Sequence, residues 1–109
     1  MKSEFEYRLT RKAETDLEEI VSCIADELSN PKAASDFLDR LQIAIAEIRL
    51  FPECGPIVEN EYLPTTDVRK ILVESYILYY LPDCDAKMIT ILRIIYSRRD
   101  MDDIMKHLF

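Results

Sequence analysis

The sequence contains little glycine, histidine or cysteine, and these shortages argue against several kinds of site. One glycine in 109 residues leaves little room for flexible loops or linkers. The three cysteines, Cys23, Cys54 and Cys84, lie far apart and follow no Cys-x-x-Cys or Cys/His spacing, which argues against a disulfide framework and a zinc site. The acidic residues show no metal-ligand spacing either. We therefore expect no metal ion and no small-molecule cofactor.

Long apolar runs are also missing. No stretch of about 18 apolar residues is present to span a bilayer. Residues 1–7 carry two glutamates in place of a basic, apolar leader. We therefore expect a cytoplasmic protein with no membrane partner. With 49% hydrophobic and 32% charged residues, the chain fits one compact domain over residues 1–109.

The net charge of -7 is unevenly distributed along the chain. Residues 1–65 hold 14 acids and 7 bases, whereas residues 66–109 hold 7 of each. An acidic protein does not bind nucleic acid through bulk electrostatics, because such binding depends on many Lys and Arg contacts to phosphates. The second half does contain several arginines, so a local positive patch is expected there.

Hydrophobic periodicity predicts a strand followed by two helices. Residues 4–10 alternate polar and apolar side chains, which is typical of a half-buried strand. Apolar residues then recur at steps of three and four over residues 11–29, with Thr10 as N-cap. Asn30-Pro31 begins a second helix that runs to Pro52. The short connection makes the two helices an antiparallel hairpin.

The second half predicts three strands and a terminal helix. Residues 68–73 and 76–81 form a hairpin around Glu74-Ser75, and after a turn at 82–86 a third strand covers residues 87–97. Asp100 is expected to cap a short last helix, which would carry His107, the only histidine. The predicted order is βααβββα, an α+β fold in which the helical hairpin packs on one face of a mainly antiparallel sheet.

Arg93 lies inside the apolar run of the last predicted strand. A guanidinium keeps its charge, so it needs a phosphate, a carboxylate or water as partner. A loop acid such as Glu59, Glu61 or Asp67 is one structural candidate.

Regular strand alternation separates the polar residues of this run. It places Arg93 with Ile95 and Ser97 on one face, and Tyr96 with Leu92, Ile94 and Arg98 on the other. Only a β-bulge or the strand's end would bring Arg93 and Tyr96 together. Two further structural interpretations concern neighbouring residues. Tyr79 and Tyr80 are expected to pack on opposite faces, and the residues from Arg98 to Asp100 also fit a solvated turn.

Four segments in fixed order resemble the RelE/ParE toxins of type II toxin–antitoxin systems. They are Tyr7-x-Leu9-x-x-x-Ala13-x-x-Asp16-Leu17-x-x-Ile20, Leu50-Phe51-Pro52-x-x-Gly55, Arg69, and the run from Arg93 to Asp100. The resemblance covers nearly the whole chain. It implies a small RelE/ParE-like domain whose helical hairpin covers one sheet face, leaving the other face or a groove for a target and an antitoxin.

The resemblance leaves the target open, because some members cleave mRNA on the ribosome and others inhibit DNA gyrase. A metal-independent endoribonuclease would use Arg69 and Arg93 on the scissile phosphate, with Tyr96 or Ser97 assisting. Tyr96 stands where relatives often carry a histidine, and a phenol is a weak base. Arg98 and Arg99 are candidates for contacts to the target or the antitoxin.

Three functional hypotheses follow from the resemblance. The first is a growth-inhibiting toxin that cleaves ribosome-bound mRNA. The second is a non-enzymatic inhibitor of DNA gyrase, and the third is a degenerate member that only binds an antitoxin. The second is favoured by the acidic composition, by the lack of the lysine pairs usual in the RNA-cutting branch, and by Tyr96 in place of a histidine. The embedded Arg93 favours the first. In all three the expected partner is a cognate antitoxin protein.

Overall fold

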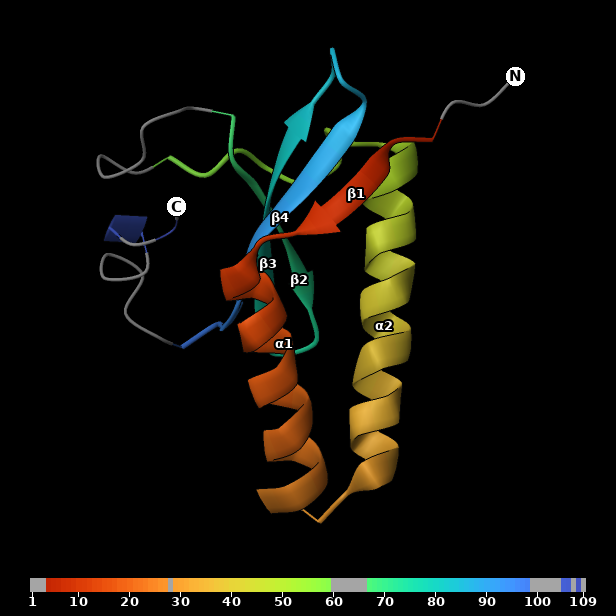
Figure 1. Ribbon diagram of the computed structural model, residues 1–109, viewed down its shortest axis with the longest axis vertical. Coiled ribbons are helices and arrows are strands. Elements are labelled where there is room, and N and C mark those ends of the chain that lie inside the picture. The colour runs from red at the N-terminus through yellow and green to blue at the C-terminus, as the bar shows by residue number, and fades with distance from the viewer. Residues whose placement is uncertain (1–3, 28, 60–66, 99–104, 107, 109) are drawn as a thin grey trace.

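The computed structural model describes residues 4–27, 29–59, 67–98, 105, 106 and 108 (Figure 1). In chain order its elements are β1 (Glu6–Leu9), α1 (Arg11–Ser22), the π-helical turn η1 (Cys23–Glu27), α2 (Pro31–Leu50), β2 (Arg69–Val73), β3 (Tyr76–Asp83) and β4 (Met88–Tyr96). The strands form one sheet in the order β1-β4-β3-β2. β1 runs parallel to β4, and the other two pairs are antiparallel. The predicted α+β fold with a mainly antiparallel sheet is confirmed.

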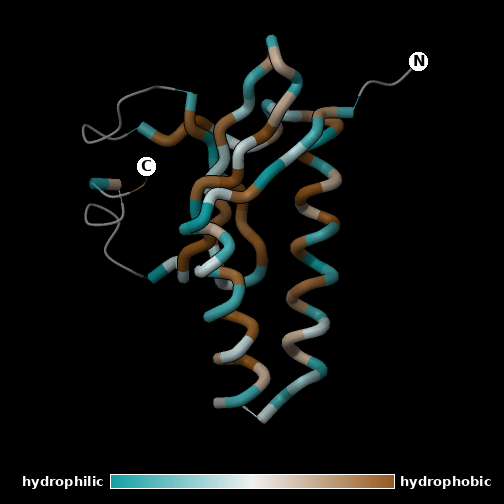
Figure 2. The backbone as a smooth tube through the Cα atoms, in the orientation of Figure 1, coloured by the Kyte–Doolittle hydropathy of each residue, from teal (hydrophilic) through white to brown (hydrophobic). Residues whose placement is uncertain are grey.

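The two helices begin at the predicted caps. The side chain of Thr10 accepts a hydrogen bond from the Ala13 N–H at 3.1 Å, and that of Asn30 accepts one from the Ala33 N–H at 3.1 Å. Figure 2 shows the apolar stretches of α2 recurring on the side turned towards α1 and the sheet. The first helix was predicted to continue to residue 29, but its α-helical part ends at Ser22. No helix among the described residues is long and apolar enough to cross a membrane.

The hairpin between β2 and β3 turns at Glu74-Ser75, as predicted. Glu74 has a φ of 55°, in the left-handed region that a tight hairpin turn requires. The next turn begins later than predicted, because Pro82 and Asp83 still belong to β3. The Asp83 carboxylate then accepts hydrogen bonds from the Asp85 and Ala86 N–H groups, which closes the turn.

β1 is shorter and more exposed than the alternating pattern predicts. It lies at the edge of the sheet, and none of its residues is fully buried. Tyr7, expected to face the core, is 43% exposed and lies beneath the Arg49 guanidinium, 5.6 Å from ring centroid to Cζ. A cation over an aromatic face gives this tyrosine a favourable position without burial.

Each face of the sheet has its own core. The helix-facing core includes Phe37, Leu78 and Tyr80, whereas Tyr79 and Leu92 belong to the core on the opposite face. The prediction that Tyr79 and Tyr80 pack on opposite faces is confirmed.

The sheet face away from the helices is partly covered. Val58, Val68, Met105 and Leu108 pack there, so the chain itself occupies part of the face that the resemblance left for a target or an antitoxin. Met105 and Lys106 are helical, but Asp100, the predicted cap of the terminal helix, lies outside the described residues, as do most residues of that helix.

α1 completes the edge of β4 where β1 ends. β1 pairs with β4 only as far as Leu9 opposite Ile91. Beyond that point the Thr10 hydroxyl donates to the Leu92 carbonyl at 2.8 Å, and the Asp16 carboxylate accepts from the Ile94 N–H at 3.1 Å. Two side chains of one helix thus satisfy backbone groups that would otherwise need a further strand.

Replacing Thr10 with alanine tests this edge. Thr10→Ala removes both the helix cap and the bond to Leu92, so we expect a loss of about 2 kcal/mol in the free energy of unfolding. Thr10→Ser keeps the hydroxyl and should lose less than about 0.5 kcal/mol. Urea denaturation of both variants measures the difference. Equal stability of the two variants would show that the hydroxyl does not hold the edge.

Candidate functional site

A β-bulge in β4 changes the direction of the residues around Arg93. Tyr79 of β3 lies opposite Arg93, whereas Tyr80 lies opposite Ile91, so Leu92 is an extra residue on β4. A bulge of this kind bends the strand and interrupts the alternation of its side chains.

The bulge overturns the predicted distribution of side chains along β4. Ile91 and Ile94 both pack in the helix-facing core, although they are three residues apart. Leu92 and Ile95 both pack in the core on the other face. The predicted placement of Leu92 and Ile94 on a common face is therefore wrong. Arg93 and Ile95 do share a face as predicted, because their cross-strand partners Tyr79 and Ile77 both lie on the face away from the helices. Regular alternation holds on each side of Leu92 but not across it.

Arg93 is held by Asp16 of α1. Its Nε lies 2.6 Å from Asp16 Oδ2 and its Nη2 lies 2.9 Å from Oδ1, so the two side chains form a bidentate ion pair. The side chains are only 15% and 9% exposed. Hydrogen bonding to Asp16 raises the pKa of the Arg93 guanidinium above its already high value. The carboxylate occupies the Nε/Nη2 edge of the guanidinium and neutralises its charge, which weakens the attraction of Arg93 for a phosphate.

The partner of Arg93 is not one of the predicted loop acids. The acid that binds Arg93 with both carboxylate oxygens is Asp16 of α1, and Glu61 lies outside the described residues. The sequence did carry a signal for the true partner. Asp16 falls on the apolar stripe of the first helix, three residues after Ala13 and four before Ile20, and all three are buried. An acid at a buried helix position needs a cation, just as Arg93 needs an anion.

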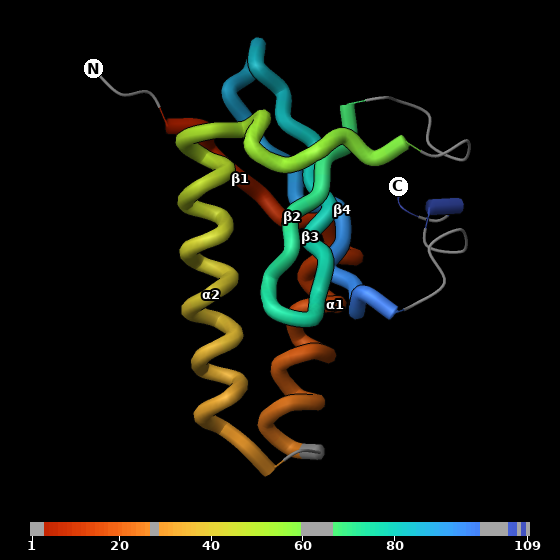
Figure 3. The backbone as a smooth tube through the Cα atoms, turned by 180° about the vertical axis from the view of Figure 1, so that it is seen from behind, coloured from red at the N-terminus to blue at the C-terminus, as the bar shows by residue number. Residues whose placement is uncertain are grey.

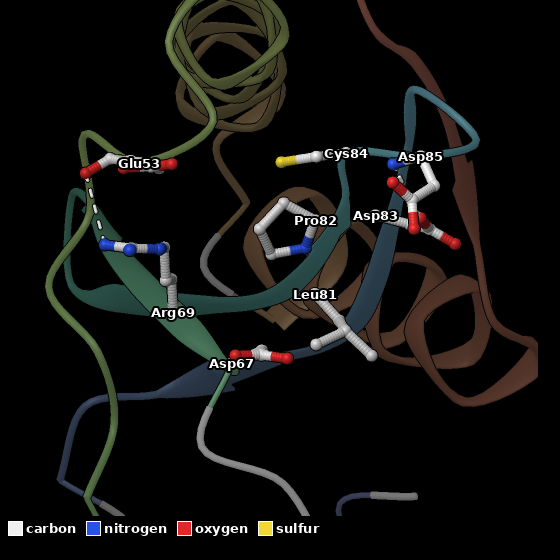
Figure 4. A pocket seen from close by; sticks show the side chains of 8 residues that line it. All are labelled: Glu53, Asp67, Arg69, Leu81, Pro82, Asp83, Cys84 and Asp85. Atoms are coloured by element: carbon white, nitrogen blue, oxygen red, sulfur yellow. Dashed lines mark hydrogen bonds between the residues drawn. The ribbon is translucent and has the colours of Figure 1, made fainter.

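Arg69 lies in a separate pocket at the other side of the sheet (Figure 4). Its Nη1 donates to the carbonyl oxygens of Gly55 at 2.7 Å and Glu53 at 3.2 Å. The same pocket is lined by four acidic residues, Glu53, Asp67, Asp83 and Asp85. One arginine among four carboxylates leaves the pocket negative, which disfavours an anionic ligand.

Tyr80 and Gly55 fix the loop that carries these carbonyls. The buried Tyr80 hydroxyl donates to the Pro52 carbonyl at 2.9 Å and accepts from the Gly55 N–H at 3.1 Å. A Cβ at position 55 would clash with the Lys70 carbonyl oxygen, so the chain's single glycine is required by close packing. Burial raises the pKa of the Tyr80 phenol to about 12.

Tyr96, Ser97 and Arg98 lie at the end of β4 and beyond it. Tyr96 is 42% exposed, and its ring meets that of Tyr76 edge to face at 5.6 Å between centroids. Tyr76 in turn contacts Phe37 of α2 at 5.2 Å. The Ser97 N–H donates to the Ser75 carbonyl, which closes the end of the sheet. Ser97 and Arg98 are exposed, and Arg99 lies outside the described residues.

The predicted site residues are therefore anchored to different elements. Arg93 is bound to α1, Arg69 to the loop after α2, and Tyr96 to a row of aromatic rings. Their catalytic roles stay predictions. Among the described residues, no three or more His, Cys, Asp or Glu side chains form a group that could hold a metal ion.

A double-mutant cycle tests the coupling of Arg93 and Asp16. Asp16→Leu and Arg93→Met each leave a buried charge unpaired, so each should lower the free energy of unfolding by about 3–5 kcal/mol. The double variant should lose only about 1–3 kcal/mol, mainly from the unsatisfied Ile94 N–H. Urea denaturation measures all three. Losses that simply add in the double variant would contradict a coupled pair.

The phenol of Tyr80 predicts a loss of stability at high pH. Its folded pKa of about 12 lies above the value near 10 expected in the unfolded chain. Its contribution is therefore complete below pH 10 and is lost as the pH rises towards 12, by about 2 kcal/mol. Tyr80→Phe lacks this ionisation, so the stability gap between wild type and variant should shrink between pH 9 and 12 in urea titrations. A constant gap would refute the assignment.

Comparisons with known proteins agree with this fold. The toxin–antitoxin complex RelBE2 from Mycobacterium tuberculosis contains a chain that superposes with a TM-score of 0.62 and 18% identity, covering 86% of this chain and 99% of that chain. A chain of the chromosomal ParDE toxin–antitoxin system from P. aeruginosa superposes with a TM-score of 0.67 and 22% identity, covering 86% and 97%. At these identities the two structures show a shared fold.

The sequence itself carries the family assignment. No curated protein matches the chain significantly. The family model described as ParE toxin of type II toxin-antitoxin system, parDE, matches residues 7–101. This range includes the four segments that resemble RelE/ParE toxins, from Tyr7 to Asp100. The chain belongs to the ParE toxin family of type II toxin–antitoxin systems.

Proposed function

We propose that this toxin arrests growth as a protein ligand that inhibits DNA gyrase, and not as an endoribonuclease. The single observation that carries the proposal is the bidentate ion pair between Arg93 and Asp16. Binding a phosphate through the edge of Arg93 that holds Asp16 would leave a carboxylate that is 9% exposed without a counterion. Binding through the other edge would bring the phosphate beside the Asp16 charge, which repels it. That cost opposes the catalytic use of Arg93.

The surroundings of Arg69 support the same choice. Cleavage of a phosphodiester by the RNA's own 2′-hydroxyl builds negative charge on the phosphate in the transition state. At Arg69 that charge would develop beside four carboxylates. Repulsion from these groups offsets the attraction of one guanidinium, so the pocket is unsuited to an anionic transition state.

The acid and base of an endoribonuclease are also not assembled in the described part of the chain. The Tyr96 ring packs edge to face against the Tyr76 ring, and a phenol is in general a poor substitute for a histidine as a base. His107, the only histidine of the sequence, lies outside the described residues. A protein ligand needs none of these groups, because it acts by binding.

The cognate antitoxin is the proposed second partner. Both solved relatives named above are toxin–antitoxin complexes or systems. An antitoxin of this chain would present basic residues to its acidic first half, or carboxylates to exposed arginines such as Arg98. A toxin that acts on gyrase would work in the cytoplasm, which is the proposed location.

Two parallel assays test the target. The purified toxin should inhibit supercoiling of relaxed plasmid by gyrase, and the antitoxin should relieve the inhibition. Added to translating ribosomes, it should leave mRNA intact. Arg69→Ala should keep at least about half of the gyrase inhibition, because this arginine holds a loop and not a phosphate.

Each contrary result has a distinct meaning. Cleavage of ribosome-bound mRNA that Arg69→Ala abolishes would overturn the proposal and establish an endoribonuclease. Absence of both effects, with antitoxin binding intact, would identify a degenerate member that retains only the antitoxin-binding fold.

A further inference from the structure

Two cysteines from distant parts of the sequence line one cavity. Cys54 lies in the loop after α2, and Cys84 follows directly after β3, 30 positions later. Both are exposed thiols, and neither is part of a disulfide. The cavity has a volume of about 580 Å³, and its other lining residues are Phe5, Leu50, Phe51, Pro52 and Glu53. The wide spacing that argued against a disulfide framework therefore conceals a pair that the fold brings to one place.

Strand alternation directs Cys84 towards the loop after α2. Tyr80 of β3 packs in the helix-facing core, and every second residue of a strand points to the same face. Cys84 comes four positions after Tyr80, so it continues that face just beyond the end of β3. The Tyr80 hydroxyl itself binds the Pro52 carbonyl of the same loop. Figure 4 shows the Cys84 thiol pointing towards the part of the loop that carries Glu53.

The two thiols differ in how firmly they are held. The Cys54 side chain is hydrogen-bonded to the Tyr80 hydroxyl, and the Cys54 N–H donates to the Phe51 carbonyl at 2.9 Å. Cys84 belongs to the turn at residues 84–87, in which every residue is exposed. Figure 3 shows this turn, between β3 and β4, at the same end of the molecule as the loop after α2. A disulfide requires two Cα atoms within about 7 Å, and an exposed turn can adjust to that distance without disturbing a core.

We propose that Cys54 and Cys84 form a reversible disulfide when the protein meets a small oxidised thiol such as glutathione disulfide. One cysteine thiolate attacks a sulfur of the oxidant, which forms a mixed disulfide and releases one glutathione. The other cysteine then attacks the protein sulfur of the mixed disulfide and releases the second glutathione. The two cysteines give up two protons and two electrons in total, and these reappear in the two glutathione thiols. In reducing compartments, disulfides of this transient kind are redox sensors.

The bond would join two walls of the acidic pocket around Arg69. Glu53 belongs to the loop after α2, whereas Asp83 and Asp85 flank Cys84. Oxidation would therefore fix the loop and the turn relative to each other, and reduction would release them. The inference is independent of the gyrase proposal, because it concerns a covalent change within the toxin that is measured on the purified protein alone.

Peptide mapping without reductant, after treatment of the reduced protein with glutathione disulfide, tests the inference. We expect a peptide that joins Cys54 to Cys84 and has lost the mass of two hydrogens. Its rate of formation should not change when the protein is diluted about tenfold, because the second step occurs within one chain. Cys23→Ser is the matched control. Cys23 lies in η1, so this variant should form the link at a rate within about twofold of wild type.

Single variants at the pair supply the second readout. Cys54→Ser and Cys84→Ser should each keep glutathione on the remaining thiol of the pair, because no second thiol is present to release it. In the wild type the link should raise the urea midpoint of unfolding by at least about 0.5 M, since a cross-link restricts the unfolded chain. Dithiothreitol should return the midpoint to its original value.

The contrary results are equally distinct. Wild-type protein that yields no peptide joining Cys54 to Cys84 overturns the inference, whether or not the thiols carry glutathione. A link that joins two molecules or includes Cys23 also overturns it. So does a linked protein that unfolds at lower urea than the reduced protein, because the bond would then form only by distorting the fold.

Discussion

The bidentate ion pair between Arg93 and Asp16 joins the helical layer to the centre of the sheet. Asp16 accepts three hydrogen bonds, two from the Arg93 guanidinium and one from the Ile94 N–H. These bonds fix α1 against β4 where β1 has ended and the bulge at Leu92 has bent the strand. Each group would be costly alone, because a buried charge without a partner destabilises a fold by several kcal/mol. Together they specify how helix and sheet meet.

This pair changes how the arginines of a ParE-family toxin are interpreted. An arginine within an apolar strand suggests a ligand for phosphate, but Arg93 already has its anion within the chain. Arg69 supports the loop that Tyr80 and Gly55 anchor, and it is surrounded by carboxylates. Two remaining features are suited to contacts with proteins: the acidic first half of the chain, and exposed apolar side chains such as Ile43 and Leu72. These features support the proposal that the protein acts by binding other proteins.

Features set by nearby residues were predictable from the sequence. The caps at Thr10 and Asn30, the turn at Glu74-Ser75 and the opposite faces of Tyr79 and Tyr80 depend on residues close in the chain or on regular alternation.

Features set by distant packing were not. Nothing local marks Leu92 as the bulged residue, and Asp16 is 77 positions from Arg93. The polar surroundings of Arg69 depend on how a distant loop packs on Tyr80. The sequence did contain one indication of this contact. Asp16 and Arg93 each place a charge among apolar residues, and the free-energy cost of burying the two charges is lowest when they pair with each other.

The structural role of Arg93 is tested most directly by growth arrest with the Asp16→Leu/Arg93→Met variant, after circular dichroism has shown that it folds. The variant lacks the guanidinium but has no unpaired buried charge. If Arg93 only supports the fold, inducing the variant without antitoxin should arrest growth as the wild type does. A folded variant that no longer arrests growth, while still binding the antitoxin, would show that Arg93 acts on the target.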